Sequence, residues 1–360
     1  MRKRRPLRWS EEAEDQFRWM VPHALRFTRP DGGSAFTSDK LDAATRQLLE
    51  TAIDLIDDPD MDDIADHILP QRAPEAKTCA DLPGYASEWS SLALLRDQWS
   101  RKSRQLVVTY PESQNHLELS QSNNLLLSGP WSFQLSVDGR TMKVDTDAHW
   151  EEVAWESDED IDYLELELDI TPALRIQRSF LLARADHFLL VADAVLGDDP
   201  GKLEYQSEMS LSENVSVKTD QEVRDLVLST DKPIARVLPL ALPEWRSDPR
   251  GGSLEALDGR LVLKQSGQNS LFAPLFFDLS PKRTRRPLTW RQLTIGEMRE
   301  NLSPDVAVGY RIQIGHSQWL VYRSLTPAAN RTLIGQNLMC EFHVSRFEDT
   351  GSVKELIEVQ

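Results

Sequence analysis

Apolar and polar residues alternate one by one along much of the chain after residue 83. Over 164–170, leucine or isoleucine alternates with glutamate or aspartate, and 310–314 and 338–345 show the same period of two. Because successive side chains of a strand point to opposite faces of a sheet, each stretch predicts a strand with one buried face. The outer face of the 164–170 strand would be acidic.

Shorter apolar runs predict the remaining strands, and no helical period lies between them. These runs are 106–110, 125–127, 133–137, 180–183, 188–191, 226–228, 261–263, 276–279 and 319–322. Turn sequences such as Asp138-Gly139 and Asp258-Gly259 separate them, which favours hairpins over helical crossovers. No repeat of fixed period indicates a propeller or a solenoid. The pattern therefore predicts a mainly β fold, built as a large antiparallel β-sandwich.

The first part of the chain has a helical period instead. Ser10 and the glutamates after it predict a capped helix, kinked at Pro22. Its apolar face would carry Phe17, Met20, Ala24 and Leu25. A second helix is predicted over 41–56, with Ser38 as its cap and apolar residues at helical spacing.

A stretch rich in proline, alanine and polar residues, 70–83, follows these helices and has the composition of a linker. It divides the chain into a helical lead and linker, 1–82, and a sandwich domain, 83–360. At 360 residues the chain is long enough for one large core with a smaller appendage. A short α-helical N-terminal segment is thus expected to precede the β-sandwich.

Charge and composition exclude several classes of function. The net charge of −17 repels polyanions, so no nucleic-acid partner is predicted. No window approaches the roughly 18 apolar residues of a membrane span, and the best run, 188–195, carries Asp193. The basic start, Met1–Pro6, lacks the apolar run of a signal peptide, and the compartment stays unknown. The two cysteines, Cys79 and Cys340, allow one disulfide and exclude a multi-cysteine zinc site.

Two residues at the end of one predicted strand form a candidate acid–base pair. Tyr110 closes an apolar run, and His116 follows six residues later. A hydroxyl and an imidazole are the groups that proton abstraction beside a carboxylate requires. The alternative interpretation is an edge tyrosine with a surface histidine.

A cationic cluster stands out against the acidic average of the chain. It consists of Lys282, Arg283, Arg285, Arg286 and Arg291, with Trp290 among them. Arginine binds sulfate, phosphate or uronate groups through paired hydrogen bonds, and tryptophan stacks on sugar rings, so Arg285, Arg286 and Trp290 are candidate substrate-binding residues. The alternatives are a solvated loop and a core tryptophan.

Histidine and aspartate also gather at 145–149. His149, with Asp145 and Asp147, forms a candidate metal site, for which the alternative is a solvated loop. The carboxylates of 151–162 could bind calcium, but this segment lacks the glycine and the spacing of an EF-hand, which favours a solvated acidic face. No cofactor is predicted.

Residues 83–195 resemble the C-terminal β-sandwich of the heparinase II/III-like proteins, which are polysaccharide lyases and their relatives. Gly84-Tyr85 is similar to the start of that region, and Val137-Asp138-Gly139 to a turn within it. The best match is 174–182 followed by 186–193, a hairpin that sets a strand with Arg178 against a strand ending in Asp193. The resemblance implies a supersandwich-like fold and adds Arg178 to the candidate substrate-binding residues.

The resemblance also implies a partner and a reaction. In the family an α/α toroid precedes the sandwich and carries the tyrosine and the asparagine or histidine that perform β-elimination on uronic-acid polysaccharides. Those residues have no counterpart here, and a lead of 82 residues is too short for a toroid, although its helices could be the last of one. The sandwich normally adds a histidine-rich strand, for which 115–118, with His116, is the candidate.

Two hypotheses about function follow. The chain either acts on an anionic polysaccharide or oligosaccharide by β-elimination, or it is a non-catalytic carbohydrate-binding or structural module. Convergence of Tyr110, His116 and the Arg285 cluster in one cleft would favour the first, and their placement on different faces would favour the second.

Overall fold

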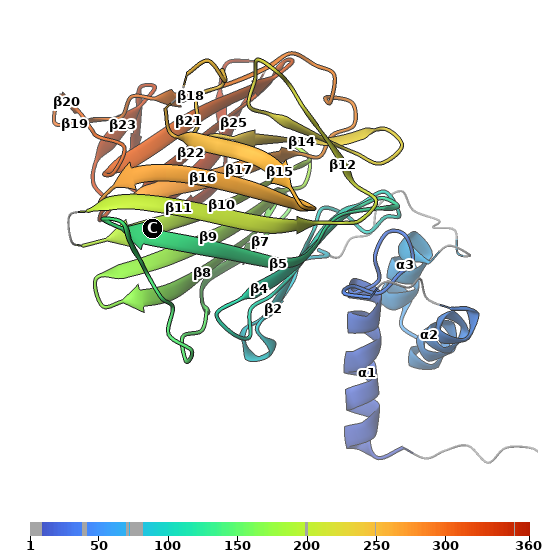
Figure 1. Ribbon diagram of the computed structural model, residues 1–360. Coiled ribbons are helices and arrows are strands. Elements are labelled where there is room, and N and C mark those ends of the chain that lie inside the picture. Colours follow the sequence, from blue (N-terminus) through green and yellow to red (C-terminus); the bar gives the residue numbers. More distant parts are fainter. Residues whose placement is uncertain are drawn as a thin grey trace, which may run out of the picture.

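A computed structural model describes residues 9–37, 42–69, 72, 82–198, 201–248, 250–348 and 350–360. The chain is mainly β, with antiparallel sheets behind a short helical segment, as the alternating pattern predicted. Figure 1 shows the helices beside the stacked sheets. No helix within the described ranges is long and apolar enough to cross a membrane.

Three helices precede the sheets: α1 (Glu11–Arg26), α2 (Ala43–Ile56) and α3 (Pro59–Ile68). Ser10 caps α1, as predicted, because its hydroxyl accepts a hydrogen bond from the Ala13 amide at 3.2 Å. The cap of α2 is Asp42 and not Ser38, which lies outside the described residues. Met20 and Ala24 were predicted to lie on the buried face of α1, but both are exposed; Val21 and Leu25 are the buried residues of α1.

The first sheet contains nine strands, in the order β1-β2-β3-β4-β5-β11-β16-β15 with β6 beside β5. Their bounds are β1 (Tyr85–Ser87), β2 (Leu92–Arg96), β3 (Arg104–Thr109), β4 (Asn115–Gln121), β5 (Asn124–Val137), β6 (Arg140–Thr141), β11 (Lys202–Leu211), β15 (Gly252–Leu257) and β16 (Arg260–Gln268). A 3-10 turn, η1 (Glu88–Ser90), joins β1 to β2. The single strand β5 contains both runs that were predicted as separate strands.

The second sheet contains eight strands, in the order β12-β13-β14-β17-β10-β9-β8-β7. Their bounds are β7 (Glu151–Ser157), β8 (Ile161–Thr171), β9 (Leu174–Ala183), β10 (Phe188–Gly197), β12 (Ser216–Thr219), β13 (Leu226–Ser229), β14 (Pro233–Pro239) and β17 (Leu271–Asp278). Every residue of β17 is buried, because both faces of this strand are covered. A strand buried on both faces needs a continuous apolar run and shows no alternation.

The third sheet contains five strands, in the order β18-β21-β22-β25-β26, and a small fourth sheet follows the order β20-β19-β23-β24. Their bounds are β18 (Leu288–Leu293), β19 (Gly296–Glu297), β20 (Glu300–Asn301), β21 (Ala307–Ile314), β22 (Ser317–Ser324), β23 (Arg331–Leu333), β24 (Gln336–Leu338), β25 (Phe342–Phe347) and β26 (Val353–Val359). The strand predicted over 338–345 is therefore interrupted at 339–341, between β24 and β25.

The first, second and third sheets stack as three layers, with the second sheet in the middle. Leu189 and Val191 of β10 pack toward the first sheet, and Leu190 and Ala192 pack toward the third. We call the space between the first and second sheets the first interlayer, and the space between the second and third sheets the second interlayer. Burial of two apolar faces on one sheet is the main stabilising contribution to this fold.

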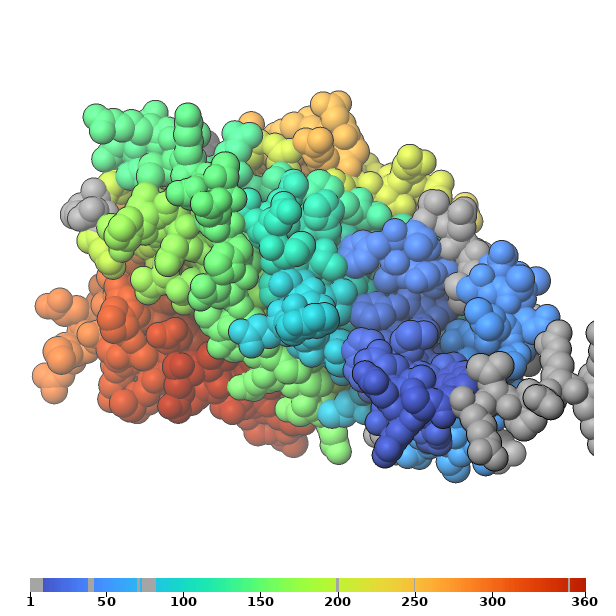
Figure 2. Space-filling view, turned by 90° about the horizontal axis from the view of Figure 1, so that it is seen from below, coloured from blue at the N-terminus to red at the C-terminus, as the bar shows by residue number. Residues whose placement is uncertain are grey.

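The helical segment is seated against the first sheet (Figure 2). The buried Arg96 donates to the Thr28 carbonyl at 2.6 Å, and Gln105 donates to the Arg26 carbonyl at 3.1 Å. Arg29 contacts Glu118 at 3.3 Å in a buried ion pair. These contacts satisfy backbone groups at the end of α1 and attach the helices to β2, β3 and β4.

Candidate functional site

Tyr110, one of the two candidate acid–base residues, follows β3 and points into the first interlayer. Its hydroxyl donates to Glu152 Oε2 at 2.7 Å. Burial, together with this hydrogen bond and the charge of Glu152, raises the pKa of Tyr110 well above the ordinary tyrosine value. The hydroxyl therefore stays protonated, and the site does not favour the phenolate that a general base would need.

His116, the candidate partner of Tyr110, lies exposed on β4. It pairs with Thr109 across the sheet, so these two side chains share a face. Tyr110 is the next residue after Thr109 and points to the opposite face. The fold thus separates the two candidate acid–base residues instead of bringing them together.

Arg178 is fully buried in the first interlayer and has no solvent-facing surface. Its Nε and Nη2 atoms donate to the two oxygens of Asp193 at 2.8 and 2.7 Å, and its Nη1 atom donates to Asn115 Oδ1 at 2.6 Å. The guanidinium also lies 3.7 Å from the ring centre of Trp131. This arrangement joins the two sheets and leaves no donor directed outward toward a polysaccharide.

The cationic cluster of 282–291 is divided by the fold. Arg285 and Arg286 are exposed in the loop between β17 and β18. Arg283 instead turns inward, donates to Asp278 at 2.6 Å and lies over the Trp319 ring. Trp290 is buried, and its indole nitrogen donates to the Leu242 carbonyl at 2.9 Å.

Asp145, Asp147 and His149 are all exposed. The nearest carboxylate to His149 Nε2 is that of Glu151, at 3.6 Å. Within the described ranges, one group of three residues places its ligand atoms close enough together to hold a single ion. None of Asp145, Asp147 and His149 belongs to that group. Of the two cysteines, Cys340 is buried and free, and Cys79 lies outside the described residues.

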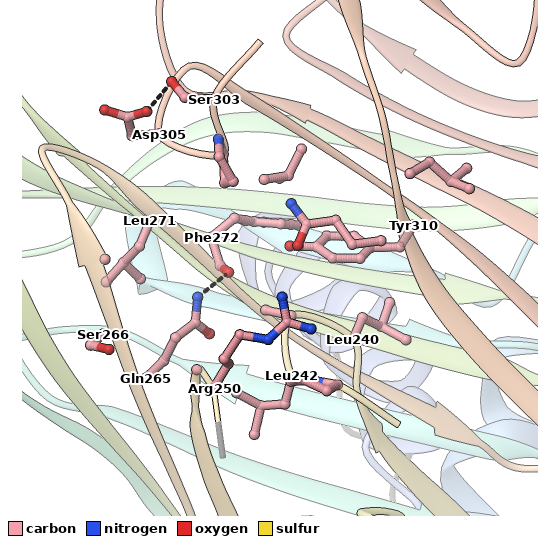
Figure 3. Close-up of a pocket in the computed structure, with 18 of the residues that line it drawn as sticks. Leu240, Leu242, Arg250, Gln265, Ser266, Leu271, Phe272, Ser303, Asp305 and Tyr310 are labelled. Atoms are coloured by element: carbon pink, nitrogen blue, oxygen red, sulfur yellow. Dashed lines mark hydrogen bonds between the residues drawn. The ribbon is translucent and has the colours of Figure 1, made fainter. Parts of the chain in front are cut away.

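A large groove opens where the three sheets meet near the loop between β14 and β15. Its volume is about 1140 Å³. Leu240, Leu271, Phe272, Trp290 and Tyr310 form its apolar floor, and all five are buried. Figure 3 shows the Arg250 side chain extending into this space beside Gln265. We call it the Arg250 groove.

Polar and aromatic groups stand along the walls of the Arg250 groove. The Arg250 side chain is 80% exposed and pairs with Asp248. Trp245 is 50% exposed. Gln265 donates to the Phe272 carbonyl at 2.9 Å, and its Oε1 atom has no partner within the described part of the chain. Burial raises the pKa of Tyr310 on the floor well above its usual value, which keeps this hydroxyl protonated.

The carboxylates of the Arg250 groove are already bound by neutral donors. Glu244 accepts a hydrogen bond from the Thr289 hydroxyl at 2.5 Å, and Asp305 accepts from Asn269 and from Ser303. A concave site with an apolar floor and a few polar groups is the usual form of a ligand site. A guanidinium and an indole at its mouth suit an acidic group on a ring with apolar faces.

Of the predicted substrate-binding residues, Trp290 lines the Arg250 groove, whereas Arg178, Arg285 and Arg286 do not. Trp245, Arg250 and Gln265 line the groove and were not predicted from the sequence. The loop that carries Trp245 and Arg250 does contain a signal, since an aromatic residue and a cation follow each other closely between two strands. Gln265 lies within a strand and has no such signal. Its position in the groove depends on the pairing of β16 with β11 and β15, which the sequence alone does not reveal.

Solved structures of heparinase-like proteins share this fold. Heparan sulfate lyase HepC from Pedobacter heparinus aligns with a TM-score of 0.61 at 15% identity, over 88% of this chain and 54% of that chain. The heparinase III BT4657 gene product aligns with a TM-score of 0.61 at 11% identity, over 88% and 53%. Heparinase III aligns with a TM-score of 0.55 at 9% identity, over 88% and 55%.

No family model matches this chain, and no curated protein does. The chain spans about half the length of the structures named above. At 9–15% identity, these alignments establish shared architecture and not shared activity. In fold, this chain is similar to the heparinase-like β-sandwich region, as the hairpin of Arg178 and Asp193 predicted.

Proposed function

We propose that this chain binds an anionic, uronate-containing polysaccharide in the Arg250 groove and does not itself cleave it. The observation that carries the proposal is the groove itself, with an exposed arginine and a half-exposed tryptophan above an apolar floor. The indole would stack on a sugar ring, and the guanidinium would bind its carboxylate or sulfate. The heparinase-like fold supports a polysaccharide as the ligand class.

The placement of Tyr110 and His116 supports binding over β-elimination. A general base must reach the proton that it removes, directly or through one water molecule. Tyr110 is buried against Glu152, and His116 lies on the opposite face of the same sheet. Neither residue lines the Arg250 groove.

Direct binding tests the proposal. Calorimetric titrations would use heparin, hyaluronan, alginate and polygalacturonate, with a neutral glucan as the ligand control. Arg250→Ala should weaken binding about tenfold, because a hydrogen bond to a charged group contributes about 1.5 kcal/mol or more. Arg260→Ala is the matched control, since Arg260 is exposed and paired with Glu208 but lies outside the groove.

The double variant Arg285→Ala/Arg286→Ala tests the competing cationic loop. Loss of binding in this variant, with full binding in Arg250→Ala, would contradict the groove assignment. Ultraviolet absorbance of unsaturated uronate products, followed over the same polysaccharides, tests the absence of cleavage. Product formation that Tyr110→Phe abolishes would overturn the non-catalytic part of the proposal.

An α/α toroid is the partner that the family resemblance implies, and we include it in the proposal as a partner of this chain. The exposed Trp19 and Met20 on α1 and Trp89 beside β1 offer apolar contacts for such a helical partner. Binding that requires a toroid, with none by this chain alone, would move the polysaccharide site away from the Arg250 groove.

A further inference from the structure

A thiol, an imidazole and two carboxylates approach one another on the outer face of the third sheet. His343 of β25 pairs with Glu358 of β26, so their side chains share a face. A β-bulge after Val344 pairs Ser345 with Glu355, which brings a second glutamate to the same face. Cys340 lies just before β25, where the chain interrupts the strand predicted over 338–345.

The separations of these groups suit a single ion. Three ligand atoms lie within 4.8 Å of one another, one each from Cys340, His343 and Glu358. His343 Nδ1 is 3.9 Å from Glu358 Oε2 and 3.8 Å from Glu355 Oε2. These last two distances are too long for hydrogen bonds, so the imidazole faces the carboxylates without bonding to them.

The buried imidazole of His343 has no hydrogen-bond partner in the described part of the chain. His343 is 4% exposed, and neither of its ring nitrogens has a hydrogen-bond partner within the described ranges. A buried polar group without a partner is rare in a folded protein, because its loss of hydration is then uncompensated. The side chains of Glu355 and Glu358 are 59% and 34% exposed, so an ion can reach the imidazole from the solvent side.

We propose that Cys340, His343 and Glu358 bind a zinc ion, with Glu355 or water as the fourth ligand. Thiolate, imidazole and carboxylate together are a ligand set that zinc accepts, whereas magnesium and calcium prefer oxygen ligands alone. Zinc ligand atoms lie about 2.0–2.3 Å from the ion, so the side chains need to close by roughly 1 Å. The Cys340 thiol loses its proton to solvent as the sulfur–zinc bond forms.

The position of the site indicates a structural role. β26 is the last strand of the chain and an edge of the third sheet. An ion held by Cys340, His343 and Glu358 would join this edge to β25 and to the turn that leaves β24. None of these residues lines the Arg250 groove, so the zinc site and the proposed polysaccharide site are independent.

Cobalt(II) provides a spectroscopic probe that reports on the thiolate directly. The full chain, without a histidine tag and stripped of metal by a chelator, is titrated with cobalt(II) and then with zinc. We expect a near-ultraviolet thiolate-to-cobalt absorption band that zinc displaces. Zinc should also raise the melting temperature, because the assembled site in the folded state binds it more tightly than the unfolded chain does. A folded chain with no band and no zinc-dependent rise in melting temperature would overturn the proposal.

Five variants locate the site. Cys340→Ser should abolish the band, and Cys79→Ser, which removes the other cysteine, should retain it; the reverse result contradicts the assignment. His343→Gln should weaken zinc binding by roughly 100-fold or more, while His316→Gln, at an exposed histidine, should leave it unchanged. If His343→Gln does not fold, Glu358→Gln replaces it, because this partly exposed carboxylate can be changed without opening the core. Unchanged zinc affinity in Glu358→Gln would also count against the site.

Discussion

Among the residues that the structure describes, each interlayer of the sandwich contains one fully buried arginine, and the two arginines are held differently. In the first interlayer, Arg178 donates through three nitrogens, two of them to Asp193 and one to Asn115. In the second, Arg323 donates through Nη2 alone, to Glu165 and to a glutamine. Its Nε and Nη1 atoms are buried and have no partner within the described part of the chain.

The two sites otherwise use the same chemistry. The Tyr205 hydroxyl donates to Asp193, and the Tyr163 hydroxyl donates to Glu165. Burial, followed by the charge of the adjacent carboxylate, raises the pKa of both tyrosines well above the ordinary value. Both tyrosines therefore remain protonated, so each carboxylate keeps one donor even when its arginine is removed.

The difference shows that the number of satisfied donors decides what a buried charge contributes. Desolvation of a guanidinium is costly, and a complete set of hydrogen bonds is needed to offset it. Arg178 has that set, and Arg323 does not. We therefore expect Arg178 to fix the pairing of the first two sheets, whereas an apolar residue should replace Arg323 at little cost.

The largest effect is expected from Arg178→Met. Removing one partner of a fully bonded buried pair leaves Asp193 charged and poorly solvated, which should cost about 3–5 kcal/mol of unfolding free energy. Urea denaturation followed by tryptophan fluorescence measures the loss. Arg175→Met is the matched control on β9, because Arg175 is half-exposed and paired with Glu167. An equal loss in Arg175→Met would mean that burial and complete hydrogen bonding of Arg178 do not account for its effect on stability.

Asp162 and Arg184 form another buried ion pair in the first interlayer, and this pair is expected to respond to pH. Asp162 lies 2.6 Å from Arg184, and Arg96 and Asp97 lie nearby. Burial outweighs the attraction of Arg184 and raises the pKa of Asp162 from 3.8 to about 6. The folded state then binds this proton more tightly than the unfolded state, so the stability from protonation is complete below 3.8 and is lost as the pH rises through about 6.

Asp162→Asn should remove this dependence. Relative to the variant, the wild type should gain about 2 kcal/mol of unfolding free energy when the pH falls from 7.5 to 4.5. Unfolding curves of both proteins across that range measure the difference, and other titrating groups cancel in it. A difference that does not change with pH would mean that Arg184 keeps the carboxylate ionised.

Arg323→Met in the second interlayer should have a smaller effect, a loss of about 1 kcal/mol or less. The substitution removes two unpaired donors along with the ion pair to Glu165, and these contributions oppose each other. The same urea titration measures it beside Arg178→Met. A loss as large as that of Arg178→Met would mean that unpaired donors do not determine how much a buried arginine contributes to stability.

The sequence predicted the layers better than it predicted the site, for reasons that particular residues show. Alternation over 164–170 and the continuous apolar run after Phe188 are properties of single strands. They can therefore be recognised in the sequence without knowing which strands lie beside them. The faces of Tyr110 and His116 depend on the turn between β3 and β4, where a shift of one residue would exchange them. The Arg250 groove arises where three sheets meet, and no local pattern encodes that meeting.

The smallest change in stability is expected at the exposed counterpart of the buried pairs, Arg250 with Asp248. Hydrogen bonds from Arg250 lower the pKa of Asp248 to about 2, so the pair is ionised at neutral pH. Water and salt screen an exposed pair, so Asp248→Asn should leave the melting temperature essentially unchanged.

The Asp248→Asn substitution should nevertheless strengthen binding of an anionic polysaccharide severalfold, because it frees Arg250 and removes a repelling charge at the groove. Asp258→Asn, in the exposed turn between β15 and β16, is the control for the change in net charge. Equal gains in both variants would mean that net charge drives binding, and unchanged affinity in Asp248→Asn would place the polysaccharide away from Arg250.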